Sequence, residues 1–343
     1  RAMLQFVGGS AGAVIAVVVL ASLNLAGPGV HRSHLLTVPK DDLFSRLGRV
    51  SALVASVYAS VSLVAAILLA GLGASPLVAI ETAIAAATTS AHLSGAIGFS
   101  GAASAIGPLI IGFVLLIGAT NVAYHADIVR SGPRVYMRDT EGAALLLGVA
   151  LLAGGLSVLS GAFDIGFFVE ALSFMSTSGM PVTNGDGVMD VLPQPAPELL
   201  AFVGGSALST AGGLKIARVF VLMSRAQIEF RRLAFANALA PLTYRGRARD
   251  DGVVMGVWVY LMAYIGATVA LMLALTLTGV PFDAAMRGSV GAISNTGPLI
   301  DPALATDTIA TRWTQVVLSI GFVLGRVEVL ALMPLFAVDF WRR

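Results

Sequence analysis

The chain has 343 residues, of which 57% are hydrophobic and only 12% are charged, and its formal net charge is +2. This balance excludes an ordinary soluble domain, in which about a quarter of the residues are charged. The sequence contains no cysteine, which excludes disulfides and thiolate metal sites, and its four histidines lack the spacing of zinc ligands. The composition predicts a protein that crosses a membrane several times.

Six long apolar runs account for this composition. They cover residues 3–25, 50–72, 106–122, 143–159, 253–277 and 316–338. As a helix, each run has about the length needed to cross roughly 30 Å of hydrocarbon. We therefore expect an all-α polytopic membrane protein.

Basic residues gather in three connections and at the end of the chain. These segments are residues 32–49, 130–138, 225–249 and 342–343. Because cytoplasmic loops of membrane proteins are enriched in lysine and arginine, all four are predicted to lie on the cytoplasmic side.

A weaker apolar segment lies among the long runs of each unit, at residues 76–99, 163–180 and 281–298. Each is too short or too polar to span, yet the chain must enter and leave on the outer side. A re-entrant half-helix with an extended return satisfies both conditions. The predicted unit is therefore a span, a re-entrant loop and a second span.

The return limbs of two units carry small polar residues followed by glycine. They consist of Ser176, Thr177, Ser178 and Gly179 in one unit, and of Ser294, Asn295, Thr296 and Gly297 in the next. Backbone carbonyls can replace the hydration shell of a cation, and glycine permits the dihedrals that point them inward. The preceding half-helices, residues 167–174 and 283–293, would aim their negative ends at the ion. The pattern predicts a cation filter, and a simple helix stop is the alternative.

Glycine and small polar residues interrupt another apolar stretch at residues 204–215, whose sequence is GGSALSTAGGLK. Glycine costs a helix about 1 kcal/mol relative to alanine, so a broken helix is predicted. Unwound backbone at membrane depth survives only beside protein or a water-filled cavity, which indicates an ion pathway. The candidate residues of this break are Ser209, Thr210, Gly212, Gly213 and Lys215. A phosphate loop is excluded because no serine or threonine follows the lysine.

Two charges, Arg326 and Glu328, lie deep in the last apolar run. Such charges are costly and usually face a cavity or a partner. We expect Arg326 to line a pore beneath the filter and Glu328 to pair with a cation such as Lys215. A purely structural ion pair is the alternative for Arg326, and snorkelling to the cytoplasmic interface is the alternative for Lys215.

Together, these motifs resemble the Trk/Ktr/HKT superfamily of potassium transporters, with bacterial TrkH/KtrB-type membrane subunits as the most similar class. Residues 204–218 are similar to its GGS-x-GST-x-GG-(I/L)-K-xx-R signature. Residues 324–328 and 340–342 resemble its C-terminal GR-(L/V)-E and tryptophan motifs. Residues 176–179 and 295–298 resemble its third and fourth filters. The resemblance covers essentially the whole chain.

The resemblance implies span–pore loop–span repeats around a central cation pore, with four repeats in the family. Residues 1–49 then hold the second span of an incomplete first repeat and its cytoplasmic connection, and residues 50–140 form repeat 2. Residues 141–251 form repeat 3 with the broken gate helix, and residues 252–343 form repeat 4. The first outer span and the first filter are expected to lie outside this sequence.

The second filter is irregular. Gly98 is its candidate residue, because residues 98–100 resemble the Gly-Phe-Ser of the family, and an alternative register uses residues 94–95. Ala96 and Ile97 occupy places where threonine or asparagine is usual, so selectivity for potassium over sodium stays open.

The resemblance implies potassium uptake into the bacterial cell across the inner membrane, without enzymatic activity. It also implies a homodimer and a cytoplasmic ring of nucleotide-binding subunits. Any nucleotide would be bound by this ring. The chain itself is predicted to bind no cofactor and no nucleic acid. The arginine-rich segment 225–249 is the predicted docking face of the ring, with lipid headgroups as the alternative. A gradient-coupled transporter, a non-conducting scaffold and a channel-like subunit of an ATP-driven pump are the alternative functions.

Overall fold

The computed structural model describes residues 2–22, 43–90, 103–132, 134, 136, 139–180, 188–234, 243–244, 247–248, 251–300 and 312–327. In these ranges the elements are helices, apart from one antiparallel pair of two-residue strands, β1 (Thr243–Tyr244) and β2 (Arg247–Ala248). The predicted all-helical class is confirmed, with this short pair as a small addition.

A helix overlaps each predicted apolar run, and in the last run the helix ends at Arg326, while residues 328–338 lie outside the described residues. These helices are α1 (Ala2–Ser22), α2 (Leu43–Gly71), α4 (Ala103–Ala119), α6 (Thr140–Ser160), α11 (Asp251–Leu277) and α14 (Arg312–Arg326). Among the described residues, three segments have the length and apolar composition to cross a membrane, namely Leu47–Gly71, Thr140–Ser160 and Val254–Leu277. Large side chains such as Leu63, Leu151 and Leu273 are exposed on them, as expected for helices that face lipid.

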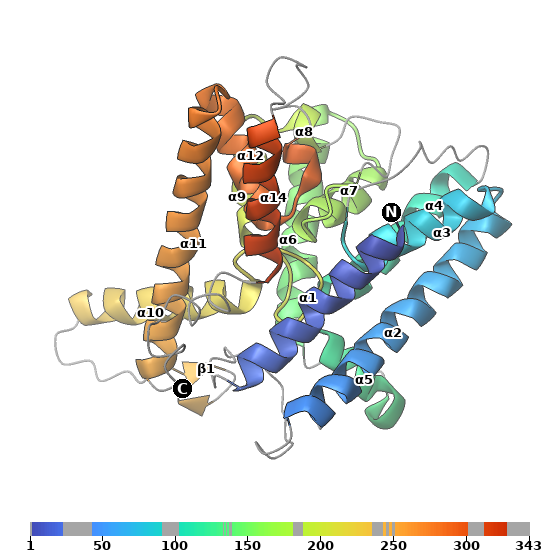
Figure 1. Ribbon diagram of the computed structural model, residues 1–343, viewed down its shortest axis with the longest axis horizontal. Coiled ribbons are helices and arrows are strands. Elements are labelled where there is room, and N and C mark those ends of the chain that lie inside the picture. The colour runs from blue at the N-terminus through green and yellow to red at the C-terminus, as the bar shows by residue number, and fades with distance from the viewer. Residues whose placement is uncertain are drawn as a thin grey trace.

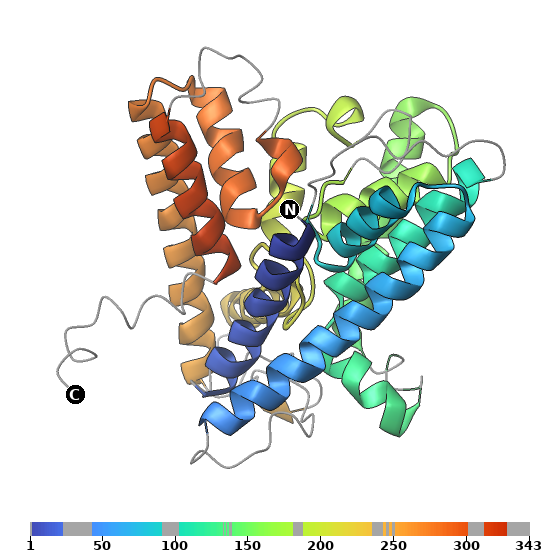
Figure 2. The same ribbon diagram turned by 45° about the vertical axis from the view of Figure 1, so that its right-hand side comes forward.

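Shorter helices occupy the predicted re-entrant segments: α3 (Pro76–Ala87), α7 (Gly166–Met175) and α12 (Phe282–Ser294). Figure 2 shows α3 against α2 and α4, and α12 against α11 and α14. Helix α3 begins with Pro76, whose missing N–H costs nothing in a first turn. Helix α7 begins where the Asp164 side chain accepts a bond from the N–H of Gly166 (2.8 Å). Short helices are therefore present in all three predicted segments, and their re-entrant course stays a prediction.

The predicted break is also present. Helix α9 (Ala196–Val203) ends at Gly204, and α10 (Ile216–Ala234) begins after residues 204–215, which we call the intramembrane loop. Helix α10 lies across the lower part of the molecule, at a steep angle to α11 (Figure 1). Its Val221 and Ile228 pack against α11, because only one face of this helix is apolar.

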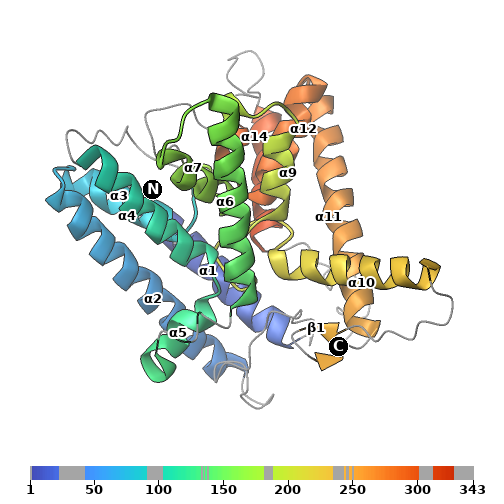
Figure 3. The ribbon, with the colours of Figure 1, turned by 180° about the vertical axis from the view of Figure 1, so that it is seen from behind.

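The remaining described elements are α5 (Val122–Ser131), α8 (Val188–Val191) and the 3-10 turn η2 (Gly297–Leu299). Figure 3 shows α5 below α4, on the same lower side as α10. The largest buried cluster contains residues of α1, α2, α3, α4, α6 and α7. It also includes Leu208 and Ala211 of the intramembrane loop. Alanine dominates the buried face of α3, and small side chains let helices approach closely. The loop is thus part of the core.

Candidate functional site

The three half-helices end in the same left-handed turn. Thr89 after α3 has a φ of 49°, Thr177 after α7 has 58°, and Asn295 after α12 has 60°. Such dihedrals are uncommon outside glycine. The accompanying bonds run from Thr89 N–H to Ala86 O (3.1 Å), from Thr177 N–H to Phe174 O (2.9 Å) and from Asn295 N–H to Ala292 O (3.2 Å). Each turn redirects the chain just beyond the negative end of a helix.

The turn after α3 was missed by sequence reasoning. Gly98 and the alternative register at residues 94–95 lie outside the described residues, so both stay predictions. Thr88 and Thr89 occupy the place that Ser176 and Thr177 take after α7, and both are buried. The signal was a hydroxyl-rich sequence, Thr88-Thr89-Ser90, after an alanine-rich helix. This sequence was not predicted as a filter segment because alanine, and not glycine, follows it.

The third predicted filter segment is buried and the fourth is partly buried, and the two lie side by side. A Cβ atom on Gly179, which has a φ of 62°, would lie 2.9 Å from Pro298 and 3.1 Å from Thr296. The hydroxyls brace the turns from within: Ser173 Oγ donates to Met180 O (2.7 Å), and Ser294 Oγ donates to Val290 O (2.7 Å). The structure thus brings both segments together.

Gly297 behaves differently from Gly179. It begins η2, a right-handed 3-10 turn, whose dihedrals suit any residue. The expectation that glycine is needed here for its dihedrals is therefore wrong for Gly297, while it holds for Gly179.

The intramembrane loop packs against all three half-helix ends. Thr89 Oγ1 donates to Thr210 Oγ1 (3.2 Å), and Gly212 N–H donates to Thr177 Oγ1 (2.6 Å). A Cβ atom on Gly212 would overlap the carbonyl oxygen of Ser294. Glycine is thus required at residue 212 because the loop backbone lies directly on the fourth segment.

Two glycines of the loop pack directly against each other, and both have positive φ angles. Gly204 has a φ of 74° and Gly213 a φ of 79°, and a Cβ atom on Gly213 would lie 2.7 Å from the Cα of Gly204. The loop closes on itself through bonds from Leu214 N–H to Phe202 O and from Lys215 N–H to Val203 O (both 2.9 Å). The break is therefore a compact turn in which several backbone groups find partners within the protein.

Lys215 points inward. Its side chain is 5% exposed, and its Nζ donates to the carbonyl of Ala211 and lies 3.4 Å from that of Ser209. This position contradicts snorkelling to the interface. Arg218 is also buried, with its guanidinium 3.8 Å from the ring centre of Tyr260 on α11. Both cations therefore fasten the loop and the start of α10 to the protein interior.

Arg326 joins α14 to the loop and to the end of α3. Its Nη1 donates to Thr210 O (2.6 Å) and its Nη2 to Thr88 O (3.1 Å). Helix α1 leaves room for it, because a Cβ atom on Gly12 would lie 3.2 Å from the Arg326 side chain. A small enclosed cavity beside it is lined by Gly12, Ala13, Ser209, Thr210, Ala211, Lys215, Gly325 and Arg326.

Glu328 lies outside the described residues, so its predicted pairing with Lys215 stays a prediction. The described partners of the Arg326 guanidinium are backbone carbonyls. Such carbonyls carry only partial negative charge, so Arg326 contributes a net positive charge directly beside the half-helix ends.

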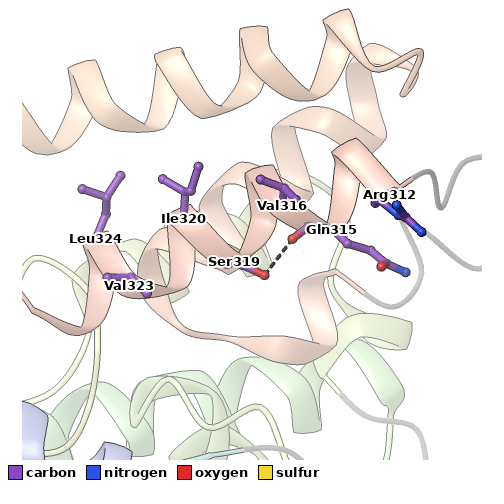
Figure 4. A pocket seen from close by; sticks show the side chains of 7 residues that line it. All are labelled: Arg312, Gln315, Val316, Ser319, Ile320, Val323 and Leu324. Atoms are coloured by element: carbon purple, nitrogen blue, oxygen red, sulfur yellow. Dashed lines mark hydrogen bonds between the residues drawn. The ribbon is translucent and has the colours of Figure 1, made fainter.

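A second hollow lies on α14, outside this site (Figure 4). It is an open groove lined by Arg312, Gln315, Val316, Ser319, Ile320, Val323 and Leu324. Ser319 Oγ donates to Gln315 O (2.7 Å). Most of the other lining side chains are aliphatic. It contains none of the predicted site residues.

No protein-family model matches the chain. The potassium uptake protein TrkH of Vibrio parahaemolyticus is 30% identical, in an alignment that covers 100% of this chain and 73% of the relative. The chain belongs to the Trk family of potassium uptake proteins. TrkH of Escherichia coli K12 is 28% identical over the same shares of the two chains. A crystal structure of the V. parahaemolyticus transporter superimposes with a TM-score of 0.77 at 24% identity, covering 100% of this chain and 72% of that one.

Family membership confirms the resemblance read from the motifs, and the structural match confirms the helical membrane-transporter fold. The relatives are named as uptake proteins and not as enzymes. As a Trk protein with helices of membrane-spanning length, the chain is a multi-pass protein of the bacterial inner membrane.

Proposed function

We propose that this Trk protein takes up potassium through a pore whose filter includes the three half-helix ends and whose gate is the intramembrane loop. The observation that carries the proposal is one hydrogen-bonded cluster in the core. In it, Thr210 contacts Thr89, Gly212 contacts Thr177, and Arg326 contacts both Thr88 and Thr210. Four segments far apart in sequence meet there.

The filter role rests on electrostatics. A helix carries about half a negative charge at its C-terminal end, and three such ends converge on the turns at Thr89, Thr177 and Asn295. Two hydroxyls of these segments are already engaged: Ser176 Oγ donates to Ser173 O (2.9 Å), and Ser294 Oγ donates to Val290 O (2.7 Å). Backbone carbonyls are then the groups that would replace water around potassium. In this proposal Ser176, Thr177, Ser178 and Gly179, with Ser294, Asn295, Thr296 and Gly297, line the ion path.

The gate role rests on position and charge. The loop fills the space directly against the half-helix ends, and the guanidinium of Arg326 sits at the same place. A fixed positive charge there would repel a permeating cation. Opening would exchange a few hydrogen bonds, each worth about 1 kcal/mol net, so the closed and open states could interconvert readily.

Regulation would reach the gate through α10. This helix starts directly after the loop, and Ile216 N–H still donates to Gly205 O (3.0 Å). A pull on α10 would therefore act on the loop backbone. We propose that a cytoplasmic ring of nucleotide-binding subunits docks on the basic segment 225–249 of a homodimer. The alternative of lipid contact fits the exposed Arg231 at the lower side of the molecule.

The deciding experiment is cation flux into liposomes that contain the purified protein. We expect potassium-driven uptake that persists when sodium and proton gradients are collapsed. Uptake that stops with either gradient would instead indicate a coupled transporter. Complete absence of cation flux, with folded protein in the membrane, would favour a scaffold subunit, and strict dependence on an added ATPase would favour a pump subunit.

A further inference from the structure

The intramembrane loop is fastened on its far side to the elbow between α4 and α5. Ser206 N–H donates to Ala119 O (3.0 Å), Thr210 N–H donates to Gly118 O (3.1 Å), and Val122 N–H donates to Leu208 O (3.1 Å). These are backbone bonds and form without any particular side chain. They hold one edge of the loop along its first half.

A side chain also holds this same stretch of the loop, between Ser206 and Leu208. Oε2 of Glu141, in the first turn of α6, accepts a bond from the N–H of Ala207 (2.8 Å). Glu141 is only 1% exposed, and a charge-assisted bond in such a setting is stronger than a neutral one. Asp139 caps the same helix by accepting the N–H of Glu141 (3.1 Å), which fixes the turn that carries Glu141. The N-terminal end of α6 also favours a negative charge there.

A series of contacts joins the elbow to the turn that carries Glu141. In the elbow, His125 Nε2 bonds Ile117 O (2.9 Å), and a carbonyl can only accept, so Nε2 carries the hydrogen. The other ring nitrogen then accepts from the hydroxyl of Tyr136. The carbonyl of Tyr136 accepts the N–H of Asp139 (3.0 Å). Tyr136 thus links the elbow to the first turn of α6.

We infer that Glu141 is a positioning residue that holds the intramembrane loop in its packed conformation. It reaches the loop from the first turn of α6, and the lower end of α6 lies on the same side of the molecule as α10 (Figure 3). This contact gives the loop an attachment to that side that is independent of α10. The effect of Glu141 on transport rests on the proposed gate, whereas its hold on the loop does not.

Hydrogen–deuterium exchange of the peptide that contains residues 204–215 tests the hold directly. In Glu141→Ala, the amides around Ala207 are expected to exchange on the order of tenfold faster, because a bond to a charged acceptor is lost. Glu141→Gln keeps an acceptor oxygen of the same reach and should restore most of the protection. Glu198→Ala is the matched control, since Glu198 is also a buried carboxylate, 4% exposed, and makes no bond to the loop among the described residues.

The outcomes separate the two proposals. Unchanged loop exchange in Glu141→Ala, or equal acceleration in the Gln variant, would overturn the positioning role whatever the flux. Faster exchange with raised basal flux supports both the hold and the gate. Faster exchange with wild-type flux supports the hold and contradicts the gate. If Glu141→Ala does not fold, Glu141→Met fills the same space without an acceptor and gives the same readings.

Discussion

The half-helix ends and the intramembrane loop are both buried irregular backbone, but they are held in different ways. The ends are braced within their own units: Ser173 bonds Met180 seven residues on, and Ser294 bonds Val290 four residues back. The loop is held by partners at least 35 residues away in the chain, such as Gly118, Glu141 and Thr177. Local bonds keep a turn rigid when helices shift, whereas long-range bonds break when they do. A filter needs the first kind of support and a gate needs the second.

Shortening the intramembrane loop is the strongest test of this comparison. Removing residues 209–213 deletes the bonds that tie the loop to three half-helix ends, so basal potassium flux should rise by roughly tenfold or more and respond less to a regulatory partner. The measurement is uptake into liposomes. A deletion that folds normally but keeps wild-type flux and regulation would make the loop a packing feature.

A substitution at Gly179 tests the rigid side of the comparison. Gly179→Ala forces a Cβ atom into a left-handed position 2.9 Å from Pro298, so it should change the potassium-to-sodium permeability ratio by several-fold while the protein still folds. Gly297→Ala is the matched control, because its backbone is right-handed, and its effect should be smaller. Equal ratios in wild type and Gly179→Ala would contradict the filter assignment.

Arg326→Ala tests the positive charge that lies between the half-helix ends and the intramembrane loop. The guanidinium donates to two carbonyls, so its loss strands no opposite charge and should destabilise the protein by only about 1–3 kcal/mol. Removal of a positive charge beside the ion path should raise flux several-fold and leave selectivity nearly unchanged. Flux and thermal stability in detergent are measured together. A large loss of stability without a gain in flux would favour the purely structural role.

The smallest expected effect concerns pH at the elbow. Burial lowers the pKa of His125 below its ordinary value of 6.5, against a smaller opposite effect of its bond to Ile117. Tyr136 bonds to its ring, and Asp139 lies near Tyr136. A lowered pKa means that the neutral ring stabilises the folded state fully above pH 6.5, and that this stability is lost as the pH falls through the folded pKa.

Thermal stability should therefore decline from pH 7.5 to pH 5.5 by a few degrees, and His125→Gln, which cannot titrate, should decline less. An identical pH dependence in both proteins would show that the titration of His125 does not affect the stability of the protein.

The sequence by itself determined much of this protein, because the relevant signals are local. Apolar length located the spans, and four glycines within ten residues predicted the broken helix at residues 204–213. Small polar residues before Gly179 marked one proposed filter segment, and the family followed from these motifs in order. Helix formation, helix breaking and membrane insertion depend mainly on neighbouring residues.

Only the tertiary structure decided the rest. It placed Thr89 as the counterpart of Thr177, turned Lys215 inward, laid α10 across the molecule and brought Glu141 to Ala207, 66 residues away in the chain. The physical reason is the same in each case. A buried polar group must find a partner wherever the fold provides one, and neither the distance along the chain nor the type of residue reveals in advance which partner that is.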